Sequence, residues 1–186
     1  QTMANFTFSA LDNLSGVEKI ECALDEAAYV MCSSPVQLNS LAQGAHSFKI
    51  RAVDKAGNFS VAAPLNWNID LTAPTVTMLT ADVGTFTNLQ IASMSFSGPG
   101  IASYECALDS EAYSACVSPR NLTALSSGMH VFKVRGKDSA GNLSAPAQYT
   151  WAVDLMAPTV PSIIANVPSN TILTDASFSF SSNDSN

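Results

Sequence analysis

Charged residues are scarce in this sequence, at 12% of its 186 positions, and basic residues are the scarcer kind. Only eight residues are Lys or Arg, and they are scattered along the chain. Proteins that bind nucleic acid need clustered basic side chains, because these displace the counterions of the phosphate backbone. Since the net charge is also −7, we expect no nucleic-acid partner.

Long apolar runs are missing as well. No stretch of 18 or more apolar residues occurs, so we expect no membrane span in this segment. No segment shows the apolar spacing of an amphipathic helix. Hydrophobic residues nevertheless make up 47% of the chain, which predicts a packed protein whose core is built without helices.

The sequence does contain a repeat. The segment ECALDEAAYVMC (residues 21–32) returns as ECALDSEAYSAC (residues 105–116), and both cysteine positions are offset by 84 residues (106 − 22 and 116 − 32). Landmarks further along keep the same offset: Gly44/Gly128, His46/His130, Phe48/Phe132, Arg51/Arg135, Trp67/Trp151, Asp70/Asp154 and Pro74/Pro158. A period of 84 exceeds the roughly 20–50 residues of solenoid repeats, so it predicts a tandem array of small domains.

Each repeat reads as a series of short strands with alternating apolar residues. Residues 19–25 and 27–32 predict a β-hairpin in which Cys22 and Cys32 face each other, and residues 46–54 predict the longest strand. We therefore predict all-β sandwiches of about seven antiparallel strands each. The expected core residues are Phe8, Phe48, Trp67, Phe96, Phe132 and Trp151.

The succession FxFS, ECALD, C.SP, G.H.FKVR, D.AGN.S and W.VD..AP resembles the tandem immunoglobulin-like (fibronectin type III-like) repeats of large bacterial surface and secreted proteins. The resemblance covers nearly the whole chain and implies a domain type, whereas it is unspecific for function. Aligning the copies predicts a first repeat at 1–73 that lacks its opening strand, a complete repeat at 74–157, and the opening strands of a third at 158–186. We therefore expect the chain to be a piece of a longer polypeptide.

The four cysteines admit two interpretations. A pair at positions i and i+10 without a third or fourth ligand nearby makes a poor zinc site. Disulfides Cys22–Cys32 and Cys106–Cys116, each closing a hairpin, instead fit an exported protein in an oxidising compartment. We therefore predict these two disulfides.

The two histidines, His46 and His130, lie at equivalent positions at the start of the long strand. A catalytic histidine needs a nucleophile and an orienting acid in the same pocket, and the sequence offers no such set. Paired carboxylates occur at the hairpin tips, where solvated charge is the ordinary outcome. They are Asp25 with Glu26 and Asp109 with Glu111. We predict no catalytic residues and no enzymatic activity.

One group of oxygen-bearing side chains admits a second interpretation. The DSAGN segment holds Asp138 and Asn142, and the sandwich topology would bring it near Asp70 at the end of the first repeat. Oxygen ligands from a linker and a turn suit Ca²⁺, and the resemblance implies arrays that are stiffened by calcium between domains. The same residues are also ordinary turn formers. No other cofactor is expected.

The expected function is a non-enzymatic spacer, a stalk within a bacterial adhesin or surface fibre. Its expected location is the cell surface, and its expected partners are neighbouring repeats and, in a fibre, other copies. Two alternatives remain. The pole loops, or the four extra residues around Asn13–Val17, could recognise a glycan or a protein. The strands near Val160–Ser181 could instead complete a neighbouring subunit by strand donation.

Overall fold

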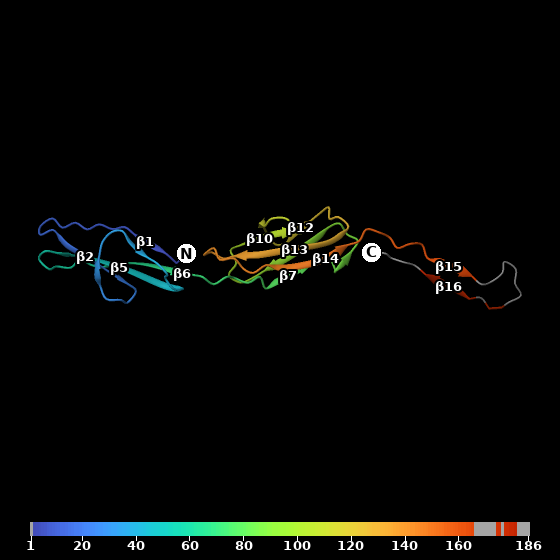
Figure 1. Ribbon diagram of the computed structural model, residues 1–186, viewed down its shortest axis with the longest axis horizontal. Helices are drawn as coiled ribbons and strands as arrows, with labels where there is room; N and C mark the ends of the chain where they lie inside the picture. The colour runs from blue at the N-terminus through green and yellow to red at the C-terminus, as the bar shows by residue number, and fades with distance from the viewer. Residues whose placement is uncertain (1, 166–173, 176, 182–186) are drawn as a thin grey trace. The chain divides into compact units, whose positions relative to one another are not determined.

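The computed structural model describes residues 2–165, 174–175 and 177–181 (Figure 1). These residues form sixteen β-strands and no helix, so the prediction of an all-β protein is confirmed. In the part of the chain that the structure describes, no helix could cross a membrane. Contacts group the chain into two compact units. Unit 1 comprises Gln1–Ala73 with Ser139–Asn142, and unit 2 comprises Pro74–Asp138 with Leu143–Asn186.

Unit 1 is built from two antiparallel sheets, with strand orders β3-β2-β5-β6 and β1-β4. Its strands are β1 (Ala4–Phe6), β2 (Val17–Leu24), β3 (Val30–Cys32), β4 (Val36–Leu38), β5 (Gly44–Asp54) and β6 (Ala63–Ile69). Aromatic rings join the two sheets, because Phe6 on β1 stacks on Phe48 with ring centroids 4.4 Å apart. Phe6 also lies 5.4 Å from the ring of Trp67 on β6.

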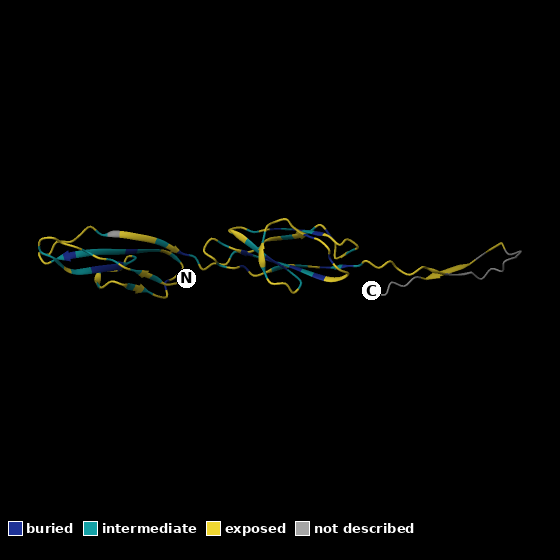
Figure 2. Cartoon of the chain, turned by 90° about the horizontal axis from the view of Figure 1, so that it is seen from above, coloured by how far each residue is buried: buried dark blue, intermediate teal, exposed yellow. Residues whose placement is uncertain are grey.

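Unit 2 contains a five-stranded sheet, β11-β10-β13-β14-β8, and a three-stranded sheet, β12-β9-β7. Pairing is antiparallel except between β14 and β8. The strands are β7 (Met78–Ala81), β8 (Phe86–Thr87), β9 (Ala92–Ser97), β10 (Ser103–Leu108), β11 (Ser114–Cys116), β12 (Arg120–Leu122), β13 (Gly128–Lys137) and β14 (Ala147–Val153). Side chains from both sheets share one core, in which Met94, Phe132 and Trp151 are at most 1% exposed. Buried segments, drawn dark blue in Figure 2, lie in both units. Both units therefore have the architecture of an immunoglobulin-like β-sandwich.

The larger sheets of the two units have the same strand register at the 84-residue offset. Glu21 lies opposite Arg51, as Glu105 lies opposite Arg135. His46 lies opposite Trp67, as its counterpart lies opposite Trp151. The repeated sequence therefore builds the same sheet twice.

The predicted core residues are not buried equally. Phe48, Phe96, Phe132 and Trp151 are buried, whereas Phe8 and Trp67 are only half-buried. In unit 2, β7 extends the small sheet beyond β9, and Leu79 on β7 packs against the core that contains Trp151. The described residues of unit 1 include no counterpart of β7, and Trp67 is half-buried where Trp151 is buried.

The last described strands, β15 (Ser162–Ala165) and β16 (Phe178–Ser181), pair only with each other. Phe178 and Phe180 on β16 are exposed (Figure 2). Residues 166–173 and 176 lie outside the described residues, so the strands predicted near Val160–Ser181 are described only in part. Strand donation and a third repeat therefore stay predictions.

Candidate functional site

Both predicted disulfides are formed, and their Cα atoms lie 5.8 Å apart in each case. The expectation that the two cysteines face each other directly is wrong, because the register pairs Cys32 with Ile20 and Cys22 with Val30. Each bond therefore runs diagonally across the hairpin and links two positions that are not directly opposite each other on the paired strands. No cysteine of the described residues is free, so none of these thiols can act as a nucleophile or a metal ligand.

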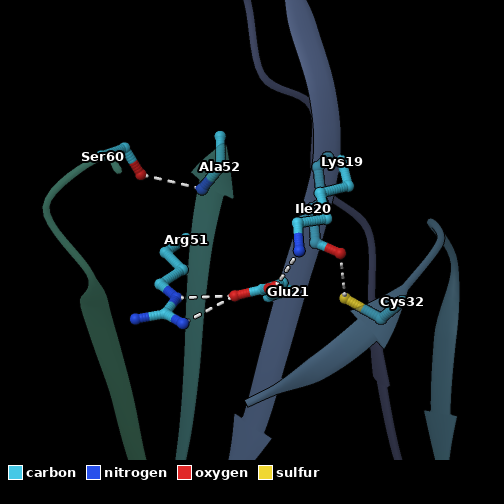
Figure 3. Close-up of polar contacts among 7 residues, drawn as sticks. All are labelled: Lys19, Ile20, Glu21, Cys32, Arg51, Ala52 and Ser60. Carbon is cyan, nitrogen blue, oxygen red and sulfur yellow. Dashed lines mark hydrogen bonds and ion pairs between the residues drawn. The ribbon is translucent and has the colours of Figure 1, made fainter. Parts of the chain in front are cut away.

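A buried ion pair crosses the large sheet of unit 1 (Figure 3). The Glu21 Oε2 atom accepts hydrogen bonds from Arg51 Nε at 2.9 Å and Nη2 at 2.7 Å. Lys19 Nζ lies 2.7 Å from the other carboxylate oxygen. Hydrogen bonds from Lys19 and then from Arg51 hold the pKa of Glu21 below its ordinary value, so this carboxylate is ionised near neutral pH.

The Arg51 guanidinium is held on its faces as well as its edge. Its Cζ atom lies 4.0 Å from the ring centroid of Tyr29 and 4.5 Å from that of Phe59. Such cation–π contacts add to the ion pair and fix the plane of the guanidinium. The charged group of Arg51 is therefore bound by residues of unit 1.

Unit 2 repeats this arrangement with fewer parts. Arg135 Nε donates to Glu105 Oε2 at 2.7 Å, and its Cζ atom lies 4.2 Å from the ring centroid of Tyr113. The position equivalent to Lys19 is Ser103, and the position equivalent to Phe59 is Leu143. The sequence analysis missed these pairs, although the glutamate of ECALD and the arginine of the long strand are both repeated.

Each histidine forms a second repeated cluster. His46 Nδ1 lies 3.1 Å from Asp25 Oδ2, and its Nε2 lies 2.9 Å from the carbonyl oxygen of Ala42. The other oxygen of Asp25 accepts the backbone N–H of Ser47 at 2.9 Å. An acid and a histidine thus meet, as in a catalytic triad, but the nitrogen that would activate a nucleophile is bonded to the backbone instead.

The second copy has the same geometry. His130 Nδ1 lies 2.9 Å from Asp109 Oδ2, and its Nε2 lies 3.0 Å from the carbonyl oxygen of Ser126. Asp25 and Asp109 are therefore structural partners of the histidines as well as partly solvated charges, with 43% and 40% of their side chains exposed. Glu26 does remain solvated, with 95% of its side chain exposed.

The environment raises the pKa of both histidines above the ordinary value. For His46 the carbonyl of Ala42 contributes most, followed by Asp25. For His130 burial opposes the change, but the Ser126 carbonyl and Asp109 outweigh it.

Near the AGN turns, short polar side chains accept hydrogen bonds from backbone N–H groups where the strands end. The Ser60 hydroxyl accepts the backbone N–H of Ala52 at 2.9 Å (Figure 3). Ser144 does the same for Gly136, also at 2.9 Å. Asp54 Oδ1 accepts the N–H of Asn58 at 2.8 Å, as expected of a turn-forming aspartate. Ser60, Ser144 and Asp54 are thus engaged by nearby backbone groups.

The residues proposed for calcium are brought together only in part. Within unit 1, Asn142 Nδ2 donates to the backbone oxygen of Asp70 at 3.0 Å, and Asp70 Oδ1 accepts the N–H of Thr72 at 2.9 Å. Across the described residues no group of three or more His, Cys, Asp or Glu side chains could hold a metal ion, and Asp138 belongs to no such group. Calcium binding stays a hypothesis. Calorimetry of the chelated protein tests it, since absence of both heat and a change in melting temperature would end it.

Solved structures similar to this chain include two sets of fibronectin type III-like modules. The structures of Clostridium thermocellum CbhA fibronectin(III)-like modules match with a TM-score of 0.43 and 20% identity, covering 82% of this chain and 85% of that one. The central fibronectin-III array of RIM-binding protein matches with a TM-score of 0.30 and 14% identity, covering 90% of this chain and 71% of that one. No protein-family model and no curated protein matches the sequence. The fold therefore rests on the strand order and the shared core described above.

Proposed function

We propose that the chain is a non-enzymatic spacer, a stalk segment of an extracellular bacterial adhesin or surface fibre. The main supporting observation is that the repeated Glu–Arg and Asp–His clusters are satisfied by contacts within their own unit. Glu21 is bound by Arg51, and Asp25 is bound by His46. Side chains that are satisfied in this way hold strands together and are not available to a substrate.

The two disulfides support a location in an oxidising compartment, because such bonds persist in exported proteins and are rare in the cytosol. They also suit a load-bearing role. Each bond closes a hairpin across 10 residues, so tension on the chain cannot extend that segment while the bond is intact. A spacer under load would keep its two hairpins even when the surrounding strands separate.

Single-molecule pulling of the whole chain tests the proposal. We expect discrete unfolding events for the two sandwich units, and a reductant should lengthen each event. Freeing a span of 10 residues should add about 30 Å, since an extended chain spans up to about 3.5 Å per residue and the bridged Cα atoms start 5.8 Å apart. Smooth extension without discrete events would contradict a mechanical role.

A second candidate function is recognition of a glycan or protein by the inserted loop of unit 1. Leu11 and Leu14 in this loop are 95% and 99% exposed. The loop has a defined conformation, because Asp12 Oδ2 accepts the N–H of Ser15 at 2.8 Å and the N–H of Gly16 at 2.6 Å. A loop that presents two leucines to solvent in a fixed geometry is typical of a contact surface.

Loop exchange distinguishes the two functions. Residues 10–16 of unit 1 correspond to residues 98–100 of unit 2, so replacing the long segment with Gly-Pro-Gly gives a matched control. If the loop is a recognition element, binding on a glycan array or in a pull-down should be lost while the melting temperature stays close to that of the parent. Binding that survives the exchange would eliminate this loop as the contact surface.

A further inference from the structure

Both imidazole rings of the chain have a hydrogen-bond acceptor at each nitrogen. In unit 1 the acceptors are a carboxylate oxygen of Asp25 and the carbonyl oxygen of Ala42, at 3.1 and 2.9 Å. In unit 2 the corresponding acceptors lie at 2.9 and 3.0 Å. The chain contains two histidines, so every imidazole that it has is placed in this way.

Neither acceptor can act as a hydrogen-bond donor to the imidazole ring. A carbonyl oxygen has no proton to give, and the Asp25 carboxylate also accepts the N–H of Ser47 through its other oxygen. Hydrogen bonds from Ser47 and then from His46 hold the pKa of Asp25 below its ordinary value, so this group is ionised near neutral pH. A neutral imidazole carries one N–H and could satisfy only one of the two acceptors. Turning the ring over would place carbon atoms against both.

We propose that His46 and His130 are proton-dependent clasps, each of which in its imidazolium form ties the loop before the long strand to the turn of the adjacent hairpin. The clasp of unit 1 joins residues 39–43 to Asp25, and that of unit 2 joins residues 123–127 to Asp109. Loss of the proton opens the side of the clasp that ends at the loop carbonyl.

The direction of opening follows from the strength of the two bonds. A neutral ring keeps its remaining N–H toward the carboxylate, because a hydrogen bond to a charged acceptor is the stronger one. The lone pair on Nε2 then faces the carbonyl oxygen of Ala42, and that contact becomes repulsive. Since the pKa of His46 is raised, the opening occurs above the ordinary titration range of histidine.

Each clasp holds a loop that buries a leucine in the core. Leu41 is 7% exposed and Leu125 is 3% exposed, and each follows a short run in which a non-glycine residue has positive φ. These strained residues are Ser40, with φ of 55°, and Ala124, with φ of 56°. Such a conformation persists only where the surroundings enforce it, so release of the clasp should loosen the loop.

Few other charged groups face the rings. On the hairpin beside His46, Glu26 lines the same surface hollow as Asp25 and pairs with Lys49 of β5 at 3.5 Å. On the opposite side the ring packs against Trp67 of β6, with centroids 5.5 Å apart. The second ring packs in the same way against Trp151, at 5.4 Å. Each ring thus contacts one carboxylate, Asp25 or Asp109, and the charge of Lys49 acts on Asp25.

Nitrogen-15 NMR of the imidazole rings in the whole chain tests the proposal, with His46→Asn assigning the two signal sets. At pH 6.5 we expect both nitrogens of each ring to be predominantly protonated, with titration midpoints above 6.5. Above the midpoint, protection of the Leu41 and Leu125 amides should fall, measured relative to the intrinsic exchange rate at each pH. Rings that are mainly neutral at pH 6.5, with one bare nitrogen, would overturn the proposal.

Variants separate the clasp from a general effect of burial. Asp25→Asn should lower the midpoint of His46 and leave that of His130 unchanged, whereas Glu26→Gln should leave both in place. An unchanged His46 midpoint in folded Asp25→Asn would refute the clasp. If Asp25→Asn fails to fold, Asp109→Asn provides the reciprocal measurement, and the titration of the parent protein decides independently of both.

Discussion

Ile101 occupies the space that a side chain on Gly136 would need. A Cβ atom at Gly136 would lie 2.7 Å from the Cγ1 atom of Ile101, closer than such atoms approach in real structures. At the equivalent positions of unit 1 the residues are Val17 and Ala52. Unit 2 fills this space with the large side chain of Ile101 beside Gly136, which has no side chain. Unit 1 fills it with Val17 and Ala52, whose side chains are intermediate in size.

This relationship predicts a compensating pair of substitutions. Gly136→Ala should destabilise unit 2 by about 1–3 kcal/mol, because overpacking a filled core forces side chains from their rotamers. Ile101→Val removes the methyl group nearest the new Cβ but keeps Cγ1, so the double variant Gly136→Ala/Ile101→Val, which reproduces the Val17/Ala52 pair of unit 1, should recover part of the loss. Urea denaturation measures both. Equal destabilisation in the single and double variants would show that the clash is not the cause.

The ion pairs predict a difference between the two units. Arg51→Lys loses the forked contact to Glu21 and the stacking on Tyr29 and Phe59, and should cost about 1–2 kcal/mol. Arg135→Lys loses the stacking on one ring and should cost less. Urea denaturation of the two matched variants compares the costs. A larger cost in unit 2 would contradict the assigned roles of the aromatic rings.

The sequence predicted those features that depend on neighbouring residues. Alternating side chains identified the strands, the repeat identified two equivalent sheets, and the spacing of Cys22 and Cys32 identified a closed hairpin. Such patterns are local, so they survive without knowledge of strand pairing. The Glu21–Arg51 pair joins residues 30 positions apart, and no local pattern fixes which residue of one strand faces which of another.

Other features could not be predicted, because they depend on which strands or side chains are neighbours in the folded protein. The alternation around Trp67 correctly marks an inward-facing position, but its exposure depends on a third strand in the small sheet. The parallel pairing of β8 with β14 likewise has no signal in two residues of sequence. The role of Asp25 was missed because a hairpin-tip carboxylate is ordinarily solvated, whereas this one reaches across to His46.

The titrating groups predict a stability maximum in mildly acidic solution. The pKa of Glu21 is lowered from 4.5 by Lys19 and then Arg51, so its stabilising contribution is complete above pH 4.5 and is lost as the pH falls through the folded value. The pKa of His46 and of His130 is raised from 6.5, so their contribution is complete below pH 6.5 and is lost as the pH rises through the folded values. The free energy of unfolding should therefore be highest between pH 4.5 and 6.5.

Urea denaturation at a series of pH values measures this profile. The double variant His46→Asn/His130→Asn should flatten its alkaline side, and it should also weaken the acidic side, because His46 helps to lower the pKa of Asp25. Glu21→Gln should reduce the acidic side without abolishing it and should leave the alkaline side unchanged. A parent protein whose stability keeps rising from pH 6.5 to 8 would show that the histidines do not stabilise the fold in their protonated form.

Removing one disulfide at a time separates its contribution from that of the sheet. Each bond closes a segment of 10 residues, for which the loss of chain entropy in the unfolded state corresponds to about 2–3 kcal/mol. Cys22→Ala/Cys32→Ala should lower the free energy of unfolding of unit 1 by that amount, and Cys106→Ala/Cys116→Ala should do the same in unit 2. Trp151 is 1% exposed and Trp67 is half-buried, so their fluorescence follows unfolding in each unit.

The stabilisation acts through the unfolded state, so the Glu–Arg and Asp–His geometries should survive in both variants. Loss of protonation at His46 in the Cys22→Ala/Cys32→Ala variant would instead show that the disulfide positions the hairpin turn on which the clasp closes.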